Sequence, residues 1–193
     1  MIQQSHLNKA RTDKFTLVIN IPDALKNINS KYARNNKTIQ LDSLQFSIFG
    51  TIVPDVQVPA IETKWAGSNI YISSHARPPY PPSTVNFTID NQFNNYWIMY
   101  QWLNLMRDDR EGSFGGITDA RDLISQKDII SVAKYSTTFN VFGKDEFNND
   151  VIKFEYFNAF PTQLGGINYS YQGSDLINSS FQFVYSNINV TLL

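Results

Sequence analysis

Thiol and imidazole groups, which carry much of the nucleophilic and metal chemistry near neutral pH, are almost absent from this sequence. It has no cysteine, so neither disulfides nor thiolate catalysis are available. Its two histidines, His6 and His75, lie in a polar N-terminal stretch and just before a proline run. No HxH or HExxH spacing surrounds either one, and the GxSxG motif is missing. A dispersed Ser-His-Asp triad stays open, but the sequence predicts no catalytic residue, no metal site and no cofactor.

Carboxylates are the next candidates for chemistry. Glycosidases need two placed carboxylates, yet glutamate is scarce and no pair stands out. An acidic cluster could bind calcium, but it does not follow the EF-hand order, which favours a solvated loop. The cluster consists of Asp108, Asp109, Glu111, Asp119 and Asp122. These observations predict a protein that is not an enzyme.

Aromatic side chains are the remaining candidate for a site, at 14% of residues. On a strand face they could stack sugars or bases, but they are more often core or subunit interface. Charged residues make up only 17% of the chain and the net charge is −1, so no global basic field would hold nucleic acid. Basic residues concentrate before residue 40 and acidic residues after it. Because aromatic residues are more often core or interface than ligand sites, and because apolar residues here lie on two sides of their elements, an interface between subunits is the favoured role for the aromatics.

Short runs of alternating apolar and polar residues, separated by turn signals, predict an all-β fold. We expect a single domain over residues 1–193: an antiparallel sandwich or barrel of about eight strands with one peripheral helix. Two polar segments, near 23–37 and 108–128, look like additional loops. The expected strands are Lys14–Ile21, Leu44–Val53, one around Val56–Val58, Asn69–Ser73, Thr84–Ile89, Lys134–Phe142, Asp150–Phe160 and, as the last, Ser179–Asn187.

The stretch from Thr84 to Asp108 predicts a strand that runs directly into a helix, with Asp90 as its N-cap. The helix is apolar on two opposite faces, whereas a surface helix needs only one. We expect the first face to pack on the subunit's own sheets: Phe93, Tyr96, Trp97, Tyr100 and Leu103. The second face is the expected assembly interface: Ile98, Met99, Trp102, Leu105 and Met106.

Three stretches in order resemble the tail tube proteins of contractile-tailed bacteriophages. Ile52 to Pro82 is similar to that family's segment in which proline-marked turns lead through a glycine turn to a strand. Thr84 to Met106 resembles its strand followed by Asp-Asn and an aromatic-rich helix with a late tryptophan. Phe154 to Val190 resembles its closing module, with an aromatic-proline step, a Leu-Gly turn and a last F-x-F-x-Y strand.

The resemblance implies a structural virion protein of the tail, assembled in the host cytoplasm. It implies that six subunits form a ring, that their sheets join into a continuous inner barrel, and that rings stack into a conduit for DNA. The implied partners are further copies of the chain and the tail sheath, baseplate and tape-measure proteins. DNA would pass through the lumen without specific binding, and the resemblance implies no catalytic residue.

Two alternatives stay open at this point. A baseplate protein that initiates the tube shares the fold. A carbohydrate-binding β-sandwich module would also expose aromatics, but we expect it to carry a signal sequence, and the start of this chain lacks the apolar region of one. No run approaches the roughly 18 apolar residues of a membrane span, so we expect no membrane segment.

Overall fold

The computed structural model describes residues 9–26, 47–51, 53–106, 135–171 and 175–193. These residues form nine strands and one long helix, all strand pairs being antiparallel. The elements are β1 (Phe15–Ile19), β2 (Ser47–Thr51), β3 (Ala60–Trp65), β4 (Ser68–Ser73), β5 (Ser83–Thr88), α2 (Asn94–Met106), β6 (Thr137–Lys144), β7 (Asp150–Leu164), β8 (Asn178–Val184) and β9 (Asn187–Leu192). The predicted all-β antiparallel sandwich with one helix is confirmed, and within the described residues the strands do not close into a barrel.

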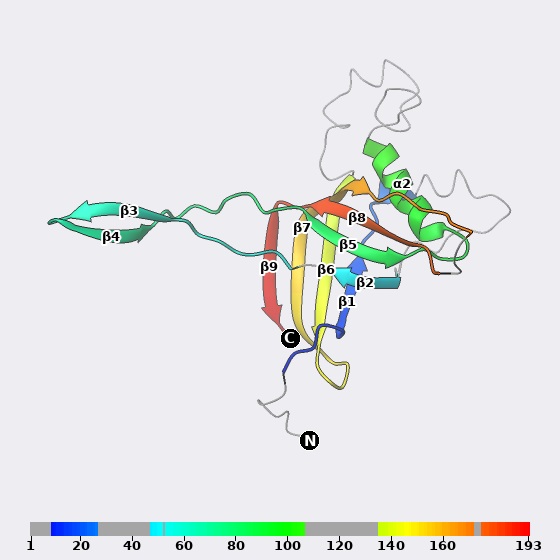
Figure 1. Ribbon diagram of the computed structural model, residues 1–193, viewed down its shortest axis with the longest axis horizontal. Coiled ribbons are helices and arrows are strands. Elements are labelled where there is room, and N and C mark those ends of the chain that lie inside the picture. Colours follow the sequence, from blue (N-terminus) through cyan, green and yellow to red (C-terminus); the bar gives the residue numbers. More distant parts are fainter. Residues whose placement is uncertain (1–8, 27–46, 52, 107–134, 172–174) are drawn as a thin grey trace, which may run out of the picture.

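The 15-residue strand β7 belongs to both layers of the sandwich. Its first half, through Phe157, pairs with β9, and its second half, from Phe160, pairs with β8. The first sheet is therefore β1, β6, the first half of β7, and β9; the second sheet is the rest of β7, β8, β5 and β2. In Figure 1 the strands of the first sheet stand side by side and those of the second cross over them. One continuous strand thus ties the two layers together.

A bulge in the middle of β7 makes this change of layer possible. Asn158 has φ = 53°, in the left-handed region, and the pairing with β6 shifts register between Thr137 and Phe139. A bulge adds one residue to a strand, bends it and increases its twist. Asparagine tolerates the left-handed conformation better than most residues, whereas a β-branched side chain is strained there. Asn158 is therefore the residue at which the first sheet bends into the second.

The core is built from strand residues that alternate between buried and exposed. On β8, Phe181 and Phe183 are 1% and 0% exposed, and Phe87 on β5 is fully buried. The ring of Phe183 lies 4.8 Å from Phe139 of β6 and 5.4 Å from Tyr156 of β7, so one side chain joins both sheets. Burying each such side chain contributes roughly 1.5–3 kcal/mol. Several of the aromatic residues noted in the sequence are therefore part of the core.

Asp90 caps the first turn of the helix as predicted, although Phe93, whose carbonyl oxygen accepts from the Trp97 N–H, is the residue directly before α2. The carboxylate of Asp90 accepts hydrogen bonds from the backbone N–H groups of Gln92, Asn94 and Asn95 at 3.0, 2.9 and 3.3 Å. The buried Asn95 side chain donates from Nδ2 to the carbonyl oxygen of Thr88 at 2.9 Å. This hydrogen bond to the end of β5 turns Asn95 toward the core. Ile98, Met99 and Trp102, which are three, four and seven positions later, lie on the same face of the helix.

The predicted interface face of the helix is wrong for three of its residues, and the predicted core face is wrong for one. Ile98, Met99 and Trp102, expected at an interface, are 1%, 0% and 0% exposed and lie in the subunit's own core. The Trp102 Nε1–H donates to the carbonyl oxygen of Tyr135 at 2.7 Å. Tyr100, expected in the core, is 44% exposed. Both faces are similarly apolar, so periodicity did not distinguish them, and the polar Asn95 tether decided the rotation.

The remaining members of the two faces occupy intermediate positions. Phe93, Tyr96 and Trp97 are partly buried and pack against the core, as predicted. Leu103 is half-buried. Leu105 and Met106, at the end of α2, are half-buried. As contacts to other parts of an assembly, Leu105 and Met106 stay a prediction.

Two strand predictions also need correction. Residues around Val56–Val58 form an extended arm without strand pairing. The chain does not close with the strand predicted at Ser179–Asn187, because β8 ends at Val184 and β9 follows after a two-residue break. Asparagine is common in turns, so its presence at positions 187 and 189 did not favour a strand in the segment that forms β9. Of the predicted additional loops, 23–26 are helical, and residues 27–37 and 108–128 lie outside the described residues.

Substitution at Trp102 distinguishes the core from an interface. We expect Trp102→Asp to yield insoluble or unfolded protein, because it places a carboxylate at a fully buried site. Tyr100→Asp, two residues along and on the exposed side, should give a folded subunit. Circular dichroism and sedimentation of both variants check this. A soluble, folded Trp102→Asp monomer would contradict the placement of this helix face in the core.

Substitution at Asn158 tests the bulge. Asn158→Val should lower the free energy of unfolding by about 1–2 kcal/mol, because a β-branched residue is strained at positive φ. Asn158→Gly is the matched control, since glycine adopts this conformation without strain. Urea unfolding of the two variants gives the comparison. Equal stability of the valine and glycine variants would show that the strand can bend without this conformation.

Candidate assembly interface

Strands β3 and β4 form a hairpin that projects from the body of the subunit on two extended arms (Figure 1). The predicted turn at Ala66-Gly67 is confirmed: both residues have positive φ, 51° and 82°, as a two-residue type I′ turn requires. Apart from half-buried Thr63, every residue of both strands is exposed. A two-stranded hairpin alone in water is marginally stable at best, so this element needs a partner.

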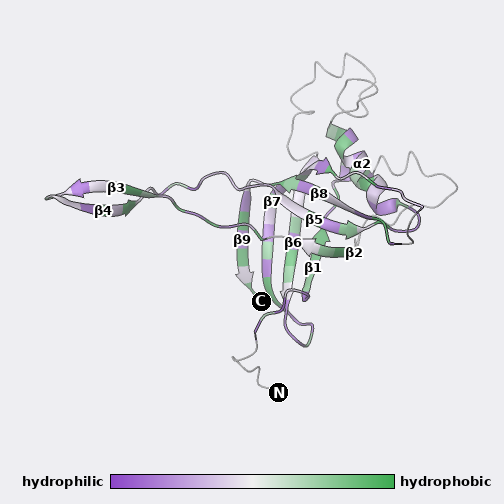
Figure 2. Ribbon diagram, viewed as in Figure 1, coloured by the Kyte–Doolittle hydropathy of each residue, from purple (hydrophilic) through white to green (hydrophobic). Residues whose placement is uncertain are grey.

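The two faces of the hairpin differ in chemistry. Residues paired directly across the two strands share a face. What we call the apolar hairpin face consists of Ile61, Thr63, Trp65, Ser68, Ile70 and Ile72. The opposite face consists of Ala60, Glu62, Lys64, Asn69, Tyr71 and Ser73, and both strands accordingly carry hydrophobic and hydrophilic residues (Figure 2). Trp65 is 73% exposed, so the apolar face is uncovered within the described subunit.

The first sheet has a free edge at each end. Among the described residues, no strand pairs with the second edge of β1 or of β9. The backbone N–H groups of Lys144 and Leu193 donate across the ladders to the carbonyl oxygens of Lys14 and Val151, each at 2.9 Å. Backbone groups in an antiparallel ladder alternate between the partner strand and the other side. Three residues on each strand therefore direct their backbone groups at the free edge: Phe15, Leu17 and Ile19 on β1, and Ile188, Val190 and Leu192 on β9.

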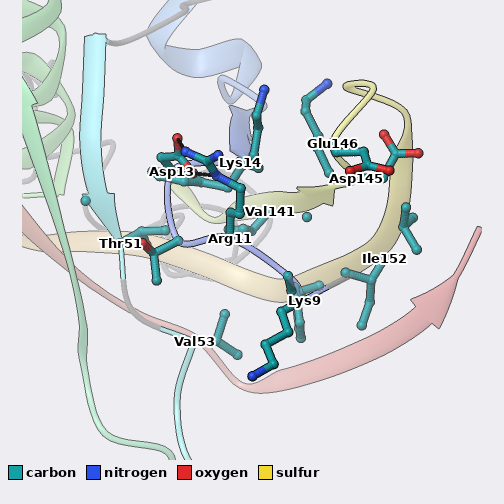
Figure 3. Close-up of a pocket in the computed structure, with 18 of the residues that line it drawn as sticks. Lys9, Arg11, Asp13, Lys14, Thr51, Val53, Val141, Asp145, Glu146 and Ile152 are labelled. Atoms are coloured by element: carbon teal, nitrogen blue, oxygen red, sulfur yellow. Dashed lines mark hydrogen bonds and ion pairs between the residues drawn. The ribbon is translucent and has the colours of Figure 1, made fainter. Parts of the chain in front are cut away.

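An open trough lies beside β2, with a volume of about 1150 Å³. Val141, Ile152 and Phe154 of the first sheet contribute apolar side chains to it. Figure 3 shows Thr51 and Val53 on one side of this trough and Ile152 on the other. Arg11 and Asp13 at its border form an ion pair at 2.9 Å, whose hydrogen bond holds the pKa of the Asp13 carboxyl below its usual range. The trough thus combines an apolar floor with charged borders.

Titratable groups do not assemble into a catalytic site in the part of the chain that the structure describes. His75 is exposed on the arm after the hairpin, while His6 and the acidic cluster at 108–122 lie outside the described residues. Burial raises the pKa of Tyr156 and of Tyr185, whose rings lie 4.9 Å apart, so both phenols stay neutral members of the core. No group of three potential metal ligands occurs among the described residues, and no described helix is long and apolar enough to cross a membrane.

The hairpin face was not singled out from the sequence as a site. The strand near Asn69–Ser73 and the turn were expected, but β3 was not. The alternation Ile61, Thr63, Trp65 was a usable signal, as was its repeat in Ile70 and Ile72. What the sequence could not show is that none of the other described residues covers this face.

A sequence model of the phage tail tube protein family matches residues 10–191 of the chain. The chain belongs to the phage tail tube protein family. This tail tube subunit is consequently a structural component of the virion tail and not an enzyme. Membership favours a tube component over the carbohydrate-binding module considered from the sequence. A comparison with curated protein sequences gives no match.

Solved structures agree with the fold of this tail tube subunit. The tube-terminating cap of the anti-feeding prophage superposes with a TM-score of 0.61 at 11% identity, covering 99% of this chain and 96% of the other. A chain of the sheath-tube complex of the PVC extracellular contractile injection system gives 0.59 at 9% identity, covering 97% and 95%. A chain of the PVC sheath/tube terminator gives 0.54 at 10%, covering 97% and 99%. At such low identities the similarity concerns the fold.

A pair of neighbouring substitutions tests whether the apolar hairpin face holds subunits together. Ile72→Asp should leave the subunit folded but prevent polymerisation, because Ile72 is 49% exposed and lies on that face. Tyr71→Asp, on the opposite face, is the matched control and should still polymerise. Sedimentation velocity reports assembly and circular dichroism reports folding. Polymerisation of the Ile72→Asp variant at the wild-type level would remove this face from the interface.

Proposed function

We propose that this protein forms hexameric rings that stack into the inner tube of a phage tail, through which DNA is delivered. The observation that carries the proposal is the pair of free edges on the first sheet. An exposed strand edge presents unpaired N–H and C=O groups and is a template for pairing with another chain. A second copy of the same sheet, rotated about a common axis, offers the complementary edge.

The strand directions suit this pairing. β1, β6, β7 and β9 alternate in direction, so β9 of one subunit beside β1 of the next continues the antiparallel pattern. The outward backbone groups belong to Ile188, Val190 and Leu192 on β9, and their counterparts on β1 are Phe15, Leu17 and Ile19. The buried members of both sets, Ile188 on β9 and Leu17 and Ile19 on β1, have side chains in the core, so the junction keeps one face of the sheet continuous. Head-to-tail contacts of this kind close into a ring when the rotation permits.

The other face of the first sheet would line the lumen, because the second sheet and α2 occupy the core side and must lie outside the ring. The lumen face carries polar residues such as Thr16, Asn189 and Thr191, beside the apolar Val18. On this face the Lys153 ammonium donates to a carboxylate oxygen of Glu155 at 3.1 Å, so these two charges offset each other. A polar wall with paired charges supports passage of DNA without specific binding, since nucleic-acid affinity depends on unneutralised basic groups.

The hairpins would connect one ring to the next, since they extend beyond the body of the subunit and their apolar faces are uncovered. In this role the whole chain acts as one domain, assembled in the host cytoplasm. The tail sheath would surround the tube, the baseplate would lie at one end, and the tape-measure protein would occupy the lumen during assembly. Similar folds in a sheath-tube complex and in a baseplate support these partners.

A second candidate function is a component at the end of the tube. Folds similar to this one occur in the cap of the anti-feeding prophage and in its baseplate. A baseplate initiator would form one ring and then nucleate the tube. Purified protein distinguishes the two roles, because a tube subunit polymerises into long stacks and an initiator stops at single rings.

Negative-stain microscopy of the purified protein tests the main proposal, with stacked six-fold rings expected. The matched variants are Val190→Pro and Val190→Thr. Proline removes an N–H at the free edge of β9 and should abolish rings while the subunit stays folded. Threonine keeps that N–H and should still form rings. Rings formed by Val190→Pro would show that this edge does not join the subunits.

A further inference from the structure

The arm that joins β4 to β5 contains a run of prolines. What we call the proline arm is residues 77–82, Arg-Pro-Pro-Tyr-Pro-Pro. Each of its residues is a proline or directly precedes one. The proline ring fixes φ at about −65°, and the residue before a proline is held out of the helical region. The proline arm is therefore an extended, polyproline-like segment that resists bending.

Tyr80 fixes the proline arm to the sandwich. Its side chain is half-buried and packs against the core. Its ring centre lies 5.3 Å from that of Tyr185, whose ring in turn lies 4.9 Å from Tyr156 in the core. After the last two prolines of the arm, β5 begins at the buried Ser83. The base of the arm is thus held by an aromatic contact and by the start of a core strand.

Arg77 connects the other end of the proline arm to this anchor. Its Nη1 donates to the hydroxyl oxygen of Tyr80 at 3.1 Å. A polyproline helix has about three residues per turn, so residues 77 and 80 lie on the same side of the arm, one turn apart. The hydrogen bond therefore runs along the arm and opposes bending between the two residues.

A bend held by hydrogen bonds joins the proline arm to the hairpin. His75 has φ = 53°, and its backbone N–H donates to Ser73 Oγ at 3.2 Å. The Ala76 N–H donates to Ser74 Oγ at 3.3 Å, and the Ser74 N–H donates to the carbonyl oxygen of Pro59 on the other arm at 2.9 Å. A residue other than glycine keeps a positive φ only where its surroundings hold it there. The hairpin therefore leaves the proline arm at a defined angle.

We propose that the proline arm, anchored by Tyr80, holds the hairpin in one direction in the free subunit, before any partner is bound. The inference goes beyond the proposed function, because it concerns the isolated subunit and not what the subunit builds. Figure 1 shows the hairpin away from the body, at the end of the two arms. An element that becomes ordered only on binding weakens the association by the conformational freedom it loses. A stiff arm removes much of that loss in advance, and Tyr80 is its positioning residue.

Single-molecule fluorescence tests the proposal in the full-length protein, since no native cysteine competes for labelling. Tyr71→Cys on the hairpin and Asn189→Cys on β9 carry the donor and acceptor dyes, and both positions are exposed. Subunits purified as monomers are measured at picomolar concentration, where each molecule is observed alone. Donor lifetimes give the distribution of distances between hairpin and body even where these distances interconvert rapidly.

We expect a single narrow distribution of distances when the arm is unchanged. Pro78→Gly combined with Pro79→Gly should abolish the narrow peak and shift the mean to shorter distances, because a flexible glycine chain is more compact than polyproline. Both prolines are exposed, so this variant leaves the core intact. Tyr80→Ala should have the same effect. Tyr80→Phe is the matched control: it keeps the ring beside Tyr185, loses only the acceptor of the Arg77 bond, and should keep the narrow peak.

An unchanged arm that gives a distribution as broad as the double-glycine variant would overturn the proposal. Equal widths for Tyr80→Ala and Tyr80→Phe would overturn the role of the Tyr80 ring as the anchor. Neither result depends on the formation of rings. A narrow distribution in a protein that forms no rings in the microscope would support the stiff arm and overturn only the proposed function.

Discussion

Backbone hydrogen bonding along β7 is the interaction on which the rest of this structure depends. A strand of 15 residues gives ladder partners to β6 on one edge and to β9 and then β8 on the other. Because one chain segment runs through both sheets, the sandwich cannot slide or separate without breaking that ladder. The left-handed Asn158 allows the strand to change layer without a loop. The aromatic core around Phe183 then fills the space that this bend encloses.

In the described part of the chain, the same architecture exposes backbone or apolar groups in three places. Among the described residues, the first sheet ends in two unpaired edges, the hairpin exposes an apolar face, and the trough beside β2 exposes apolar floor residues. Monomeric proteins rarely combine such features, because each exposes backbone or apolar groups that association would cover. A tube subunit has a physical reason for all three. In the proposed ring, edge pairing would extend the first sheet from one subunit to the next, and the projecting hairpin would reach beyond the ring.

The low content of charged and reactive side chains fits a structural role. Charges are few, and exposed ion pairs such as Arg11 with Asp13 contribute little to stability because solvent screens them. The buried tyrosines have raised pKa values because burial disfavours the phenolate, so they pack as neutral aromatic rings. On the outward side of the first sheet, polar side chains such as Thr16 and Asn189 accompany the paired Lys153 and Glu155. In the proposed lumen, such a face would be hydrated without attracting a polyanion.

The sequence by itself determined the fold class, the positions of most strands, the Asp90 cap and the Ala66-Gly67 turn. These depend on local alternation and on side chains that act within a few residues of their own backbone. The resemblance in three ordered stretches also indicated the family. Only the tertiary structure decided which face of α2 is core, because both faces are apolar and the Asn95 bond to Thr88 sets the rotation. It alone decided that Ile61, Ile70 and Ile72 are exposed among the described residues, since exposure depends on how distant segments pack.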